Sequence, residues 1–307
     1  MVIERHDVVI IGGGVAGVSA ALECVDTNLD TVVLEGRDEL GGQLPEIPHS
    51  LRTVATGLYV DGRDLQAGLW GAAALLGDRV RLGHAVSKVA LADGRVEVGE
   101  RPFGAGAVVI ATGSTRRYHP AAPDGAFGGD VTYQVEPRAD RFAGCPVVVV
   151  GGGDSATLDA LELADTAQSV ALVHRSQRLT ARRDIIERVE AETRIRDLPG
   201  WEVESIVGGP RLEAVVVVDR GRDRRMTLPA GGLVIKISRS PRTEVFDGQV
   251  DLDRGGFVVV DADLRTSCEG VFAAGDVVSG SHWRVATAIG QGALAARSVL
   301  RHLEARS

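Results

Sequence analysis

The same unit of strand, turn and helix occurs twice in the chain. An apolar run over residues 7–11 leads into Gly12-Gly13-Gly14-Val15-Ala16-Gly17, and a run over residues 146–150 leads into Gly151-Gly152-Gly153-Asp154-Ser155-Ala156. Glycines at these places permit a tight turn and the close approach of a pyrophosphate, and the N-terminus of the following helix offers amide donors to the phosphates. The repeat therefore predicts an α/β fold with two dinucleotide-binding units.

Length and charge limit the classes of protein that fit this repeat. A chain of 307 residues is long enough for two domains, and its net charge of -8 would repel a nucleic acid. The uncharged stretch from Ala67 to Gly77 is too short to cross a bilayer. We therefore expect a soluble, cytoplasmic protein of two domains, with neither a nucleic acid nor a membrane as its partner.

The residue that ends the second strand of each unit differs between the two copies. Glu35 lies 23 residues after Gly12, where a carboxylate accepts hydrogen bonds from ribose hydroxyls. The same count from Gly151 reaches His174, which Arg175 follows. A His-Arg pair removes the repulsion of a 2′-phosphate and supplies a cation, so this change favours NADP over NAD in the second unit.

Further motifs extend this pattern along the chain. Besides the two glycine loops, Glu35 and His174-Arg175, they are Gly41-Gly42-Gln43-Leu44, Ala111-Thr112-Gly113, Ala273-Ala274-Gly275-Asp276 and Thr287-Ala288. Over essentially the whole chain, the set resembles the thioredoxin-reductase branch of the two-dinucleotide-binding flavoproteins. The resemblance implies redox chemistry at FAD, NADPH as a second nucleotide, and a homodimer.

The resemblance also implies which residues hold each nucleotide. It places the Gly-Gly-Gln segment along the flavin, the Ala-Thr-Gly segment at the crossover between domains, and the Asp276 carboxylate on the ribitol chain of FAD. The implied FAD residues are Gly12, Gly14, Val15, Ala16, Gly17, Glu35, Gly36, Gly42, Gln43, Leu44, Ala111, Thr112, Gly113, Gly275, Asp276 and Ala286. The implied NADP residues are Gly151, Gly153, Asp154, Ser155, Ala156, His174 and Arg175.

The family pattern implies a discontinuous first domain, which agrees with the order of the motifs. Residues 1–115 and 245–307 are expected to form the FAD domain, and residues 116–244 an inserted NAD(P)-type domain. Each domain is expected to be Rossmann-like, doubly wound and three-layered.

The chain departs from the family at the redox-active cysteines. Thioredoxin reductases carry Cys-x-x-Cys a few residues after a tyrosine, and the matching stretch here is Tyr133-Gln134-Val135-Glu136-Pro137. Disulfide reduction needs one thiolate that attacks and a second thiol that resolves the intermediate. Cys24, Cys145 and Cys268 lie far apart, so no pair replaces the missing cysteines. A dithiol relay through this loop is therefore excluded.

Two other departures concern NADPH. Ser176 and Thr180 stand where the family commonly uses arginines for the 2′-phosphate, although Arg178 and Arg182 are near in sequence. Lys236 and bulky neighbours stand at the expected domain junction, where the family has small residues. The first change predicts a low or lost affinity for NADPH, and the second either blocks the nicotinamide or reshapes a turn.

Three functions fit these observations. The first is a reductase that passes electrons from NAD(P)H through FAD to an external acceptor, which is a ferredoxin, a flavodoxin or a small molecule. The second is an NADPH-independent flavin oxidase or dehydrogenase acting on a small or carrier-tethered substrate, and the third is a flavoprotein that serves by binding a partner. Tyr133 and Gln134, in place of the dithiol loop, and His282, as an acid or base, are the candidate catalytic residues. No metal-ligating constellation appears.

Overall fold

The computed structural model describes residues 3–47, 50–51, 53–55, 57–135 and 139–306, without the side chain of residue 139. The chain divides into two compact units. Residues 1–115 and 239–307 form unit 1, and residues 116–238 form unit 2. The chain therefore leaves unit 1 once and returns to it once.

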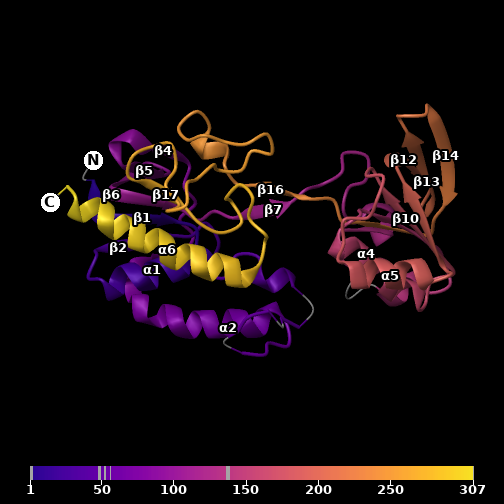
Figure 1. Ribbon diagram of the computed structural model, residues 1–307, viewed down its shortest axis with the longest axis horizontal. Coiled ribbons are helices and arrows are strands. Elements are labelled where there is room, and N and C mark those ends of the chain that lie inside the picture. Colours follow the sequence, from indigo (N-terminus) through magenta and orange to yellow (C-terminus); the bar gives the residue numbers. More distant parts are fainter. Residues whose placement is uncertain (1–2, 48–49, 52, 56, 136–138, 307) are drawn as a thin grey trace. The chain divides into compact units, whose positions relative to one another are not determined.

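Unit 1 is built on a seven-stranded sheet in the order β3-β2-β1-β6-β5-β4, with β17 also paired to β6 (Figure 1). The strands of unit 1 are β1 (Glu4–Ile11), β2 (Thr31–Leu34), β3 (Val80–Arg81), β4 (Lys88–Ala90), β5 (Arg95–Val98), β6 (Arg101–Ile110) and β17 (Val271–Ala273), with β7 (Ser114–Arg116) and β16 (Arg239–Pro241) as a separate pair. Its helices are α1 (Val15–Asp26), α2 (Gly62–Ala73) and α6 (Val285–Glu304), with short 3₁₀ turns at Leu44–Glu46, Ala74–Arg79, Leu91–Asp93 and Glu244–Phe246. Strands β3, β2, β1, β6 and β17 run parallel, as the repeated unit predicts.

Both faces of this sheet are buried. Alternate residues of β1 point to opposite sides, and each set packs in its own cluster. Val8 and Ile10 pack in a cluster with residues of α1 and α6, while Val9 and Ile11 pack with β4, β5 and the segment from 245 to 278. Helices α1 and α6 lie side by side on the first face (Figure 1). Unit 1 therefore has three layers. The carboxyl ends of its parallel strands lie on the side of the sheet where the glycine loop follows β1.

Unit 2 is built on a five-stranded parallel sheet in the order β11-β10-β9-β15-β8. Its strands are β8 (Val131–Thr132), β9 (Pro146–Val150), β10 (Ser169–His174), β11 (Ile195–Pro199), β12 (Glu202–Gly208), β13 (Leu212–Asp219), β14 (Arg224–Pro229) and β15 (Gly232–Ile235). Its helices are α3 (Ala126–Gly129), α4 (Asp154–Ala164) and α5 (Arg183–Ala191), with a 3₁₀ turn at Ala139–Phe142.

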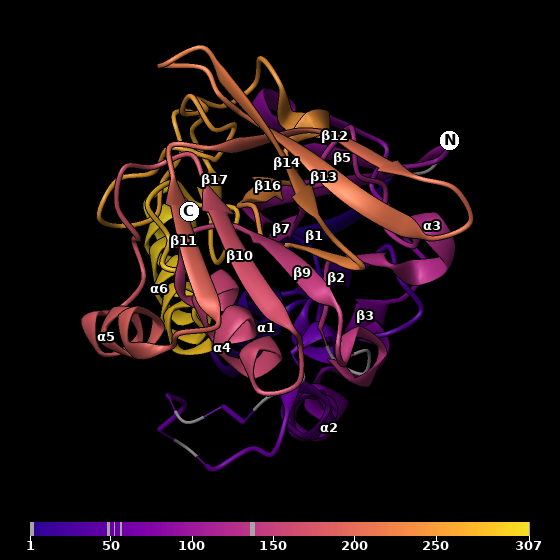
Figure 2. The same cartoon turned by 90° about the vertical axis from the view of Figure 1, so that its right-hand side faces the viewer.

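Different elements cover the two faces of the parallel sheet in unit 2. Val147 and Val149 of β9 pack with α4, while Val148 and Val150 pack with the antiparallel sheet β12-β13-β14. Figure 2 looks onto β9, β10, β11 and the long strands β12–β14 of this unit. The sequence predicted the β9–α4–β10 unit, and the structure has a second, antiparallel sheet as the third layer. Within the described residues, no helix combines the length and the apolar composition needed to cross a bilayer.

Candidate functional site

The first glycine loop connects the end of β1 to the start of α1 with very little space around it. Gly12 has φ of +110° and its amide donates to Leu34 O at 2.9 Å. A Cβ at Gly12 would lie 2.4 Å from Ala111 O, and one at Gly17 would lie 1.9 Å from Gly12 O. Val15 and Ala16 lie in the first turn of α1, where the backbone amides have no acceptor within the helix and can donate to an anion.

The Glu35 carboxylate fixes this loop from the end of β2. It is only 8% exposed, its Oε2 accepts from the Gly13 amide at 2.6 Å, and its Oε1 accepts from the Arg37 amide at 2.8 Å. Gly41 closes the other side by donating its amide to Gly13 O at 2.8 Å. Because each carboxylate oxygen has more than one lone pair, Glu35 can still accept from ribose hydroxyls.

A hydrogen-bonded cluster joins the motifs that the sequence assigns to the flavin. Gln43 Nε2 donates to Asp276 Oδ2 at 3.1 Å and contacts Ser114 Oγ at 3.2 Å. Gly42 faces Gly14, since a Cβ on Gly42 would lie 3.3 Å from the Gly14 Cα. Four segments far apart in sequence, around Gly14, Gly42, Ser114 and Asp276, thus meet near the carboxyl end of β1.

Arg239 belongs to this cluster, although it is not among the site residues predicted from the sequence. Its Nε donates to Ser114 Oγ at 2.9 Å, and its guanidinium lies 3.9 Å from the Glu46 carboxylate. Burial raises the pKa of the Asp276 carboxyl, while the Arg239 charge and the Gln43 hydrogen bond partly oppose that rise. In the sequence, the departure from the family pattern at Lys236 and the residues after it was the only indication that Arg239 matters to the site.

The other predicted FAD residues line the same edge with different exposure. Leu44 is buried, Thr112 Oγ1 donates to Arg242 O at 2.7 Å, and Gly113 has φ of +66°. Gly275 has φ of +84° and its amide donates to Gln291 Oε1 of α6 at 2.8 Å. Two predicted residues sit toward the periphery: Gly36 is exposed beside Ala85, and Ala286 is exposed in the first turn of α6.

The second glycine loop repeats the geometry of the first. Gly151 has φ of +136°, its amide donates to Val173 O at 2.9 Å, and a Cβ on it would lie 2.4 Å from Lys236 O. Thr180 donates its amide to Gly152 O at 2.7 Å, as Gly41 does to Gly13 O in the first loop. Ala156 is buried at the position of Gly17, and Ser155 is exposed beside Gly153 and Asp154 at the start of α4.

His174, which ends β10, and Arg175, which follows it, differ in burial. His174 is 3% exposed and its Nε2 lies 2.9 Å from Asp197 Oδ1, whereas Arg175 is exposed. Lys236 Nζ lies 2.8 Å from Asp159 Oδ2 of α4, so this lysine is turned toward the helix.

Known proteins match this chain over almost its whole length, including both glycine loops. Residues 6–292 fit the family described as pyridine nucleotide-disulphide oxidoreductase. The chain belongs to this family. Thioredoxin reductase of Streptomyces clavuligerus is 33% identical over 310 residues, which cover 98% of this chain and 95% of that protein. A 34.2 kDa protein in the rubredoxin operon of Clostridium pasteurianum is 30% identical, over 95% of this chain and 96% of that protein.

Solved structures of thioredoxin reductases have the same fold. The Lactococcus lactis enzyme in its FR conformation gives a TM-score of 0.82 at 26% identity, over 98% of this chain and 99% of that chain. The T. acidophilum enzyme gives 0.81 at 27% identity, over 99% of this chain and 100% of that chain. The comparisons confirm the predicted fold, with two dinucleotide-binding domains, and a thioredoxin-reductase-like oxidoreductase.

The candidate catalytic residues of this family member lie in different surroundings. Tyr133 is 1% exposed, and its hydroxyl accepts from the His119 amide at 2.6 Å and donates to Ala122 O at 3.0 Å. Both contacts of the Tyr133 hydroxyl lie within unit 2. Gln134 is half-buried and His282 is exposed, while Pro137 lies outside the described residues.

The cysteines of the chain are separate thiols. Cys24 is buried in α1, Cys145 precedes β9, and Cys268 precedes β17, all three without a disulfide. Burial raises the pKa of Cys24 to about 12 and also raises the pKa of Cys268. A thiol with a raised pKa is a poor nucleophile near neutral pH.

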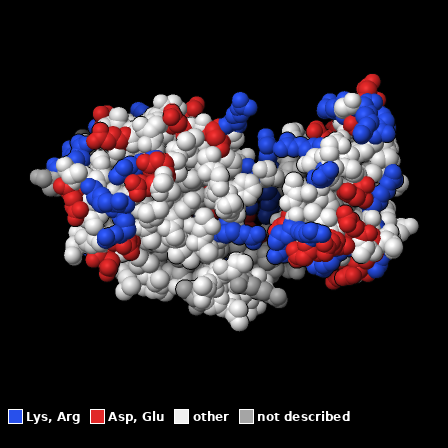
Figure 3. All heavy atoms as spheres, viewed as in Figure 1, with Lys and Arg blue, Asp and Glu red and all other residues white. Residues whose placement is uncertain are grey.

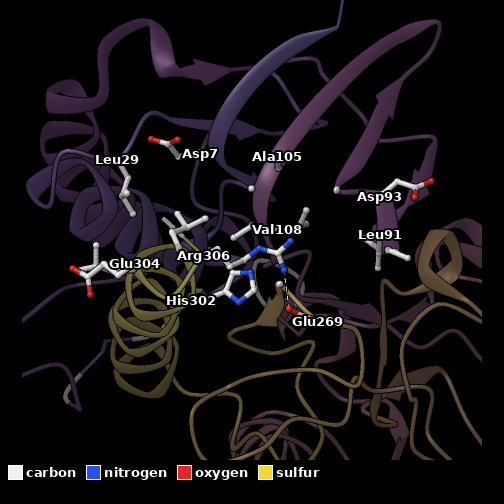
Figure 4. A pocket seen from close by; sticks show the side chains of 17 residues that line it. Asp7, Leu29, Leu91, Asp93, Ala105, Val108, Glu269, His302, Glu304 and Arg306 are labelled. Atoms are coloured by element: carbon white, nitrogen blue, oxygen red, sulfur yellow. Dashed lines mark hydrogen bonds and ion pairs between the residues drawn. The ribbon is translucent and has the colours of Figure 1, made fainter.

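A cavity of about 530 Å³ in unit 1 lies apart from the predicted cofactor residues (Figure 4). Its walls come from Asp7 of β1, the middle of β6, and His302 near the end of α6. Arg306 and Glu269 form an ion pair of 2.8 Å there, and burial, together with Arg306, lowers the pKa of His302. Since no predicted cofactor residue lines it, we treat it as separate from the cofactor site.

Proposed function

We propose that this chain is an FAD-dependent oxidoreductase that passes electrons from NADPH through FAD directly to an external acceptor. The observation that carries the proposal is the combination of two glycine loops of matched geometry with a sequence that contains no Cys-x-x-Cys. A thioredoxin reductase needs the dithiol, while transfer of electrons from the flavin itself does not. The proposal therefore excludes thioredoxin-disulfide reduction.

The residues of the first loop suit FAD. Gly14 and Gly42 lie so close together that a side chain on either would occupy the space between the two loops. The start of α1 offers backbone amides to a pyrophosphate. Glu35 supplies acceptors for ribose, and Gln43 and Asp276 supply a donor and an acceptor at the flavin end. When bound, FAD supplies the two-electron chemistry, and these side chains bind and orient it.

The charge distribution bears on the acceptor. The arginines near the β13–β14 turn are paired locally: Arg222 and Arg224 lie 3.1 and 2.9 Å from Asp219, and Arg225 lies 2.7 Å from Glu204. In Figure 3, blue and red spheres are mixed over unit 2, while a broad area of unit 1 carries neither colour. We infer that docking does not depend on a basic patch at this turn. The name of the C. pasteurianum relative, which refers to a rubredoxin operon, supports a small electron carrier as the acceptor.

The role of Arg239 in the cofactor site can be tested directly. Arg239→Gln removes a cation that opposes the burial-induced rise in the pKa of Asp276, so we expect that pKa to rise further. We also expect FAD affinity to fall about tenfold, because the Gln43–Ser114 cluster loses a charged donor. FAD dissociation constants from fluorescence titration of the apoprotein measure the effect. Arg242→Gln, which contacts the cluster through its backbone, is the control, and equal affinities in all three proteins would contradict this role.

The main experiment follows flavin bleaching in the purified protein under anaerobic stopped flow. We expect rapid bleaching with NADPH, reoxidation by a rubredoxin or a small quinone, and no reduction of thioredoxin disulfide. Because the chain has no paired thiols, bleaching without disulfide reduction would support the proposal. Absence of bleaching by NADPH and NADH at millimolar concentration would refute the reductase. If a candidate substrate then bleaches the flavin without nucleotide, an oxidase is favoured. If none of the candidate substrates bleaches it, a partner-binding role is favoured.

A further inference from the structure

The two glycine loops place different side chains in one equivalent position. Glu35 and His174 each lie 23 residues after the first glycine of their loop, at the end of a strand paired in parallel with the loop's own strand. Glu35 accepts a hydrogen bond from the amide of Gly13, the middle glycine. His174 lies beneath Gly152, the middle glycine of the second loop, where a Cβ would be 3.3 Å from the histidine Cγ and 3.4 Å from its Nδ1. The position therefore faces the loop backbone in both units.

The His174 ring has one nitrogen in use and one enclosed. Nε2 contacts Asp197 Oδ1 at 2.9 Å, while Nδ1 is buried and has no hydrogen-bond partner among the described residues. A carboxylate accepts and cannot donate, so Asp197 holds the ring proton on Nε2. Nδ1 is then an acceptor, which is the role that Glu35 Oε2 fills in the first loop.

An enclosed acceptor is unsuited to a 2′-phosphate. The phosphate has no proton to give in its dianionic form, and Nδ1 is covered by the loop. The exposed cations of the following segment are better placed. Arg175 and Arg178 are exposed in the stretch that Thr180 ties to Gly152, whereas Arg182 lies 3.4 Å from Asp154.

We propose that His174, held by Asp197, is a positioning residue for the second glycine loop and makes no contact with the 2′-phosphate, which is left to the exposed arginines that the family resemblance already implies. His174 accepts from the Gly152 amide as the loop closes on a nucleotide, and it acts equally on NADH and NADPH. This inference rests on the proposed function, because it assumes that the second loop binds a pyridine nucleotide. The inference gives His174 and Arg175 different roles, although the sequence predicts that the pair together binds the 2′-phosphate.

The test is calorimetric titration of the FAD-loaded protein with NADH and, separately, with NADPH. His174→Phe keeps the ring and removes the acceptor, so both affinities should fall by the same factor, about tenfold. His174→Asn returns an amide oxygen near the place of Nδ1 and should recover most of that loss. Combined replacement of Arg175 and Arg178 by glutamine should weaken NADPH about tenfold or more and leave NADH unchanged.

Arg183→Gln is the matched control, because Arg183 is exposed on α5 and paired with Glu187; it should bind both nucleotides as the parent does. A loss of NADPH affinity alone in His174→Phe would mean that the histidine reaches the phosphate, and would overturn the proposal. Unchanged affinities in that variant, with normal thermal unfolding, would reduce the ring to packing and overturn it as well. If the parent protein binds neither nucleotide, the proposed function fails together with this inference. If the parent binds both nucleotides normally and His174→Phe does not behave as expected, only the proposed role of His174 fails.

Discussion

A Gly17→Ala variant is expected to lose about 3 kcal/mol of the free energy of unfolding of unit 1, together with most of its bound FAD. The added methyl would lie 1.9 Å from Gly12 O and 3.3 Å from the Ala111 Cβ. The oxygen belongs to the backbone, so no side-chain rotation relieves the overlap, and α1 must move away from β1. That movement opens the loop in which the pyrophosphate of FAD is expected to lie.

Urea unfolding and the ratio of flavin to protein absorbance measure this effect. Gly68→Ala in α2 is the matched control, because nothing lies within 4 Å of its added Cβ; alanine there should raise stability by roughly 0.5 to 1 kcal/mol. Ala156→Gly makes the opposite exchange at the equivalent position of the second loop and should leave FAD content unchanged. A Gly17→Ala protein with normal flavin content and an unchanged urea midpoint would show that the close approach of α1 to β1 is not required.

The parts of the fold that the sequence predicted are those with a local cause. A strand that runs into Gly12 or Gly151 must turn sharply and start a helix, and the distance to Glu35 follows from one helix and one strand. The same counting finds His174, and its position beside Gly152 follows from the repeat. The α/β class and the two units could be predicted because each repeat contains, within a short stretch of sequence, the signals for its strand, turn and helix.

Contacts from distant segments could not be read in this way. Arg239 reaches Ser114 because β16 returns to unit 1 beside β7, and Asp197 reaches His174 because β11 pairs with β10. Neither pairing has a local signature in the sequence. Tyr133 was predicted as a catalytic candidate from its place in the family pattern, but the contacts of its hydroxyl are set by the chain around His119 and Ala122.

A buried carboxylate, Asp130, lies directly before β8 in unit 2 and is contacted by the start of β13. The Asp130 side chain is 0% exposed, its Oδ2 accepts from Arg211 Nε at 2.6 Å and from the Leu212 amide at 3.0 Å, and its Oδ1 accepts from Arg141 Nη2 at 3.1 Å. Asp130→Ala is expected to lower the free energy of unfolding of unit 2 by about 3 kcal/mol, because it leaves these donors without their shared acceptor. Urea unfolding followed by hydrogen exchange in unit 2 measures the loss.

The same carboxylate predicts a pH dependence of unit 2. Burial alone would raise the pKa of Asp130, but the hydrogen bonds from Arg211, Leu212 and Arg141 outweigh it and lower that pKa. The unfolded chain therefore takes up the proton first, at a pKa of about 3.9. The stabilisation is complete above that pH and is lost as the pH falls through the lower, folded value. Asp130→Ala should remove this part of the acid sensitivity, while Glu187→Gln, in an exposed ion pair on α5, should keep it. Equal acid sensitivity in the parent and in Asp130→Ala would assign the effect to other carboxylates.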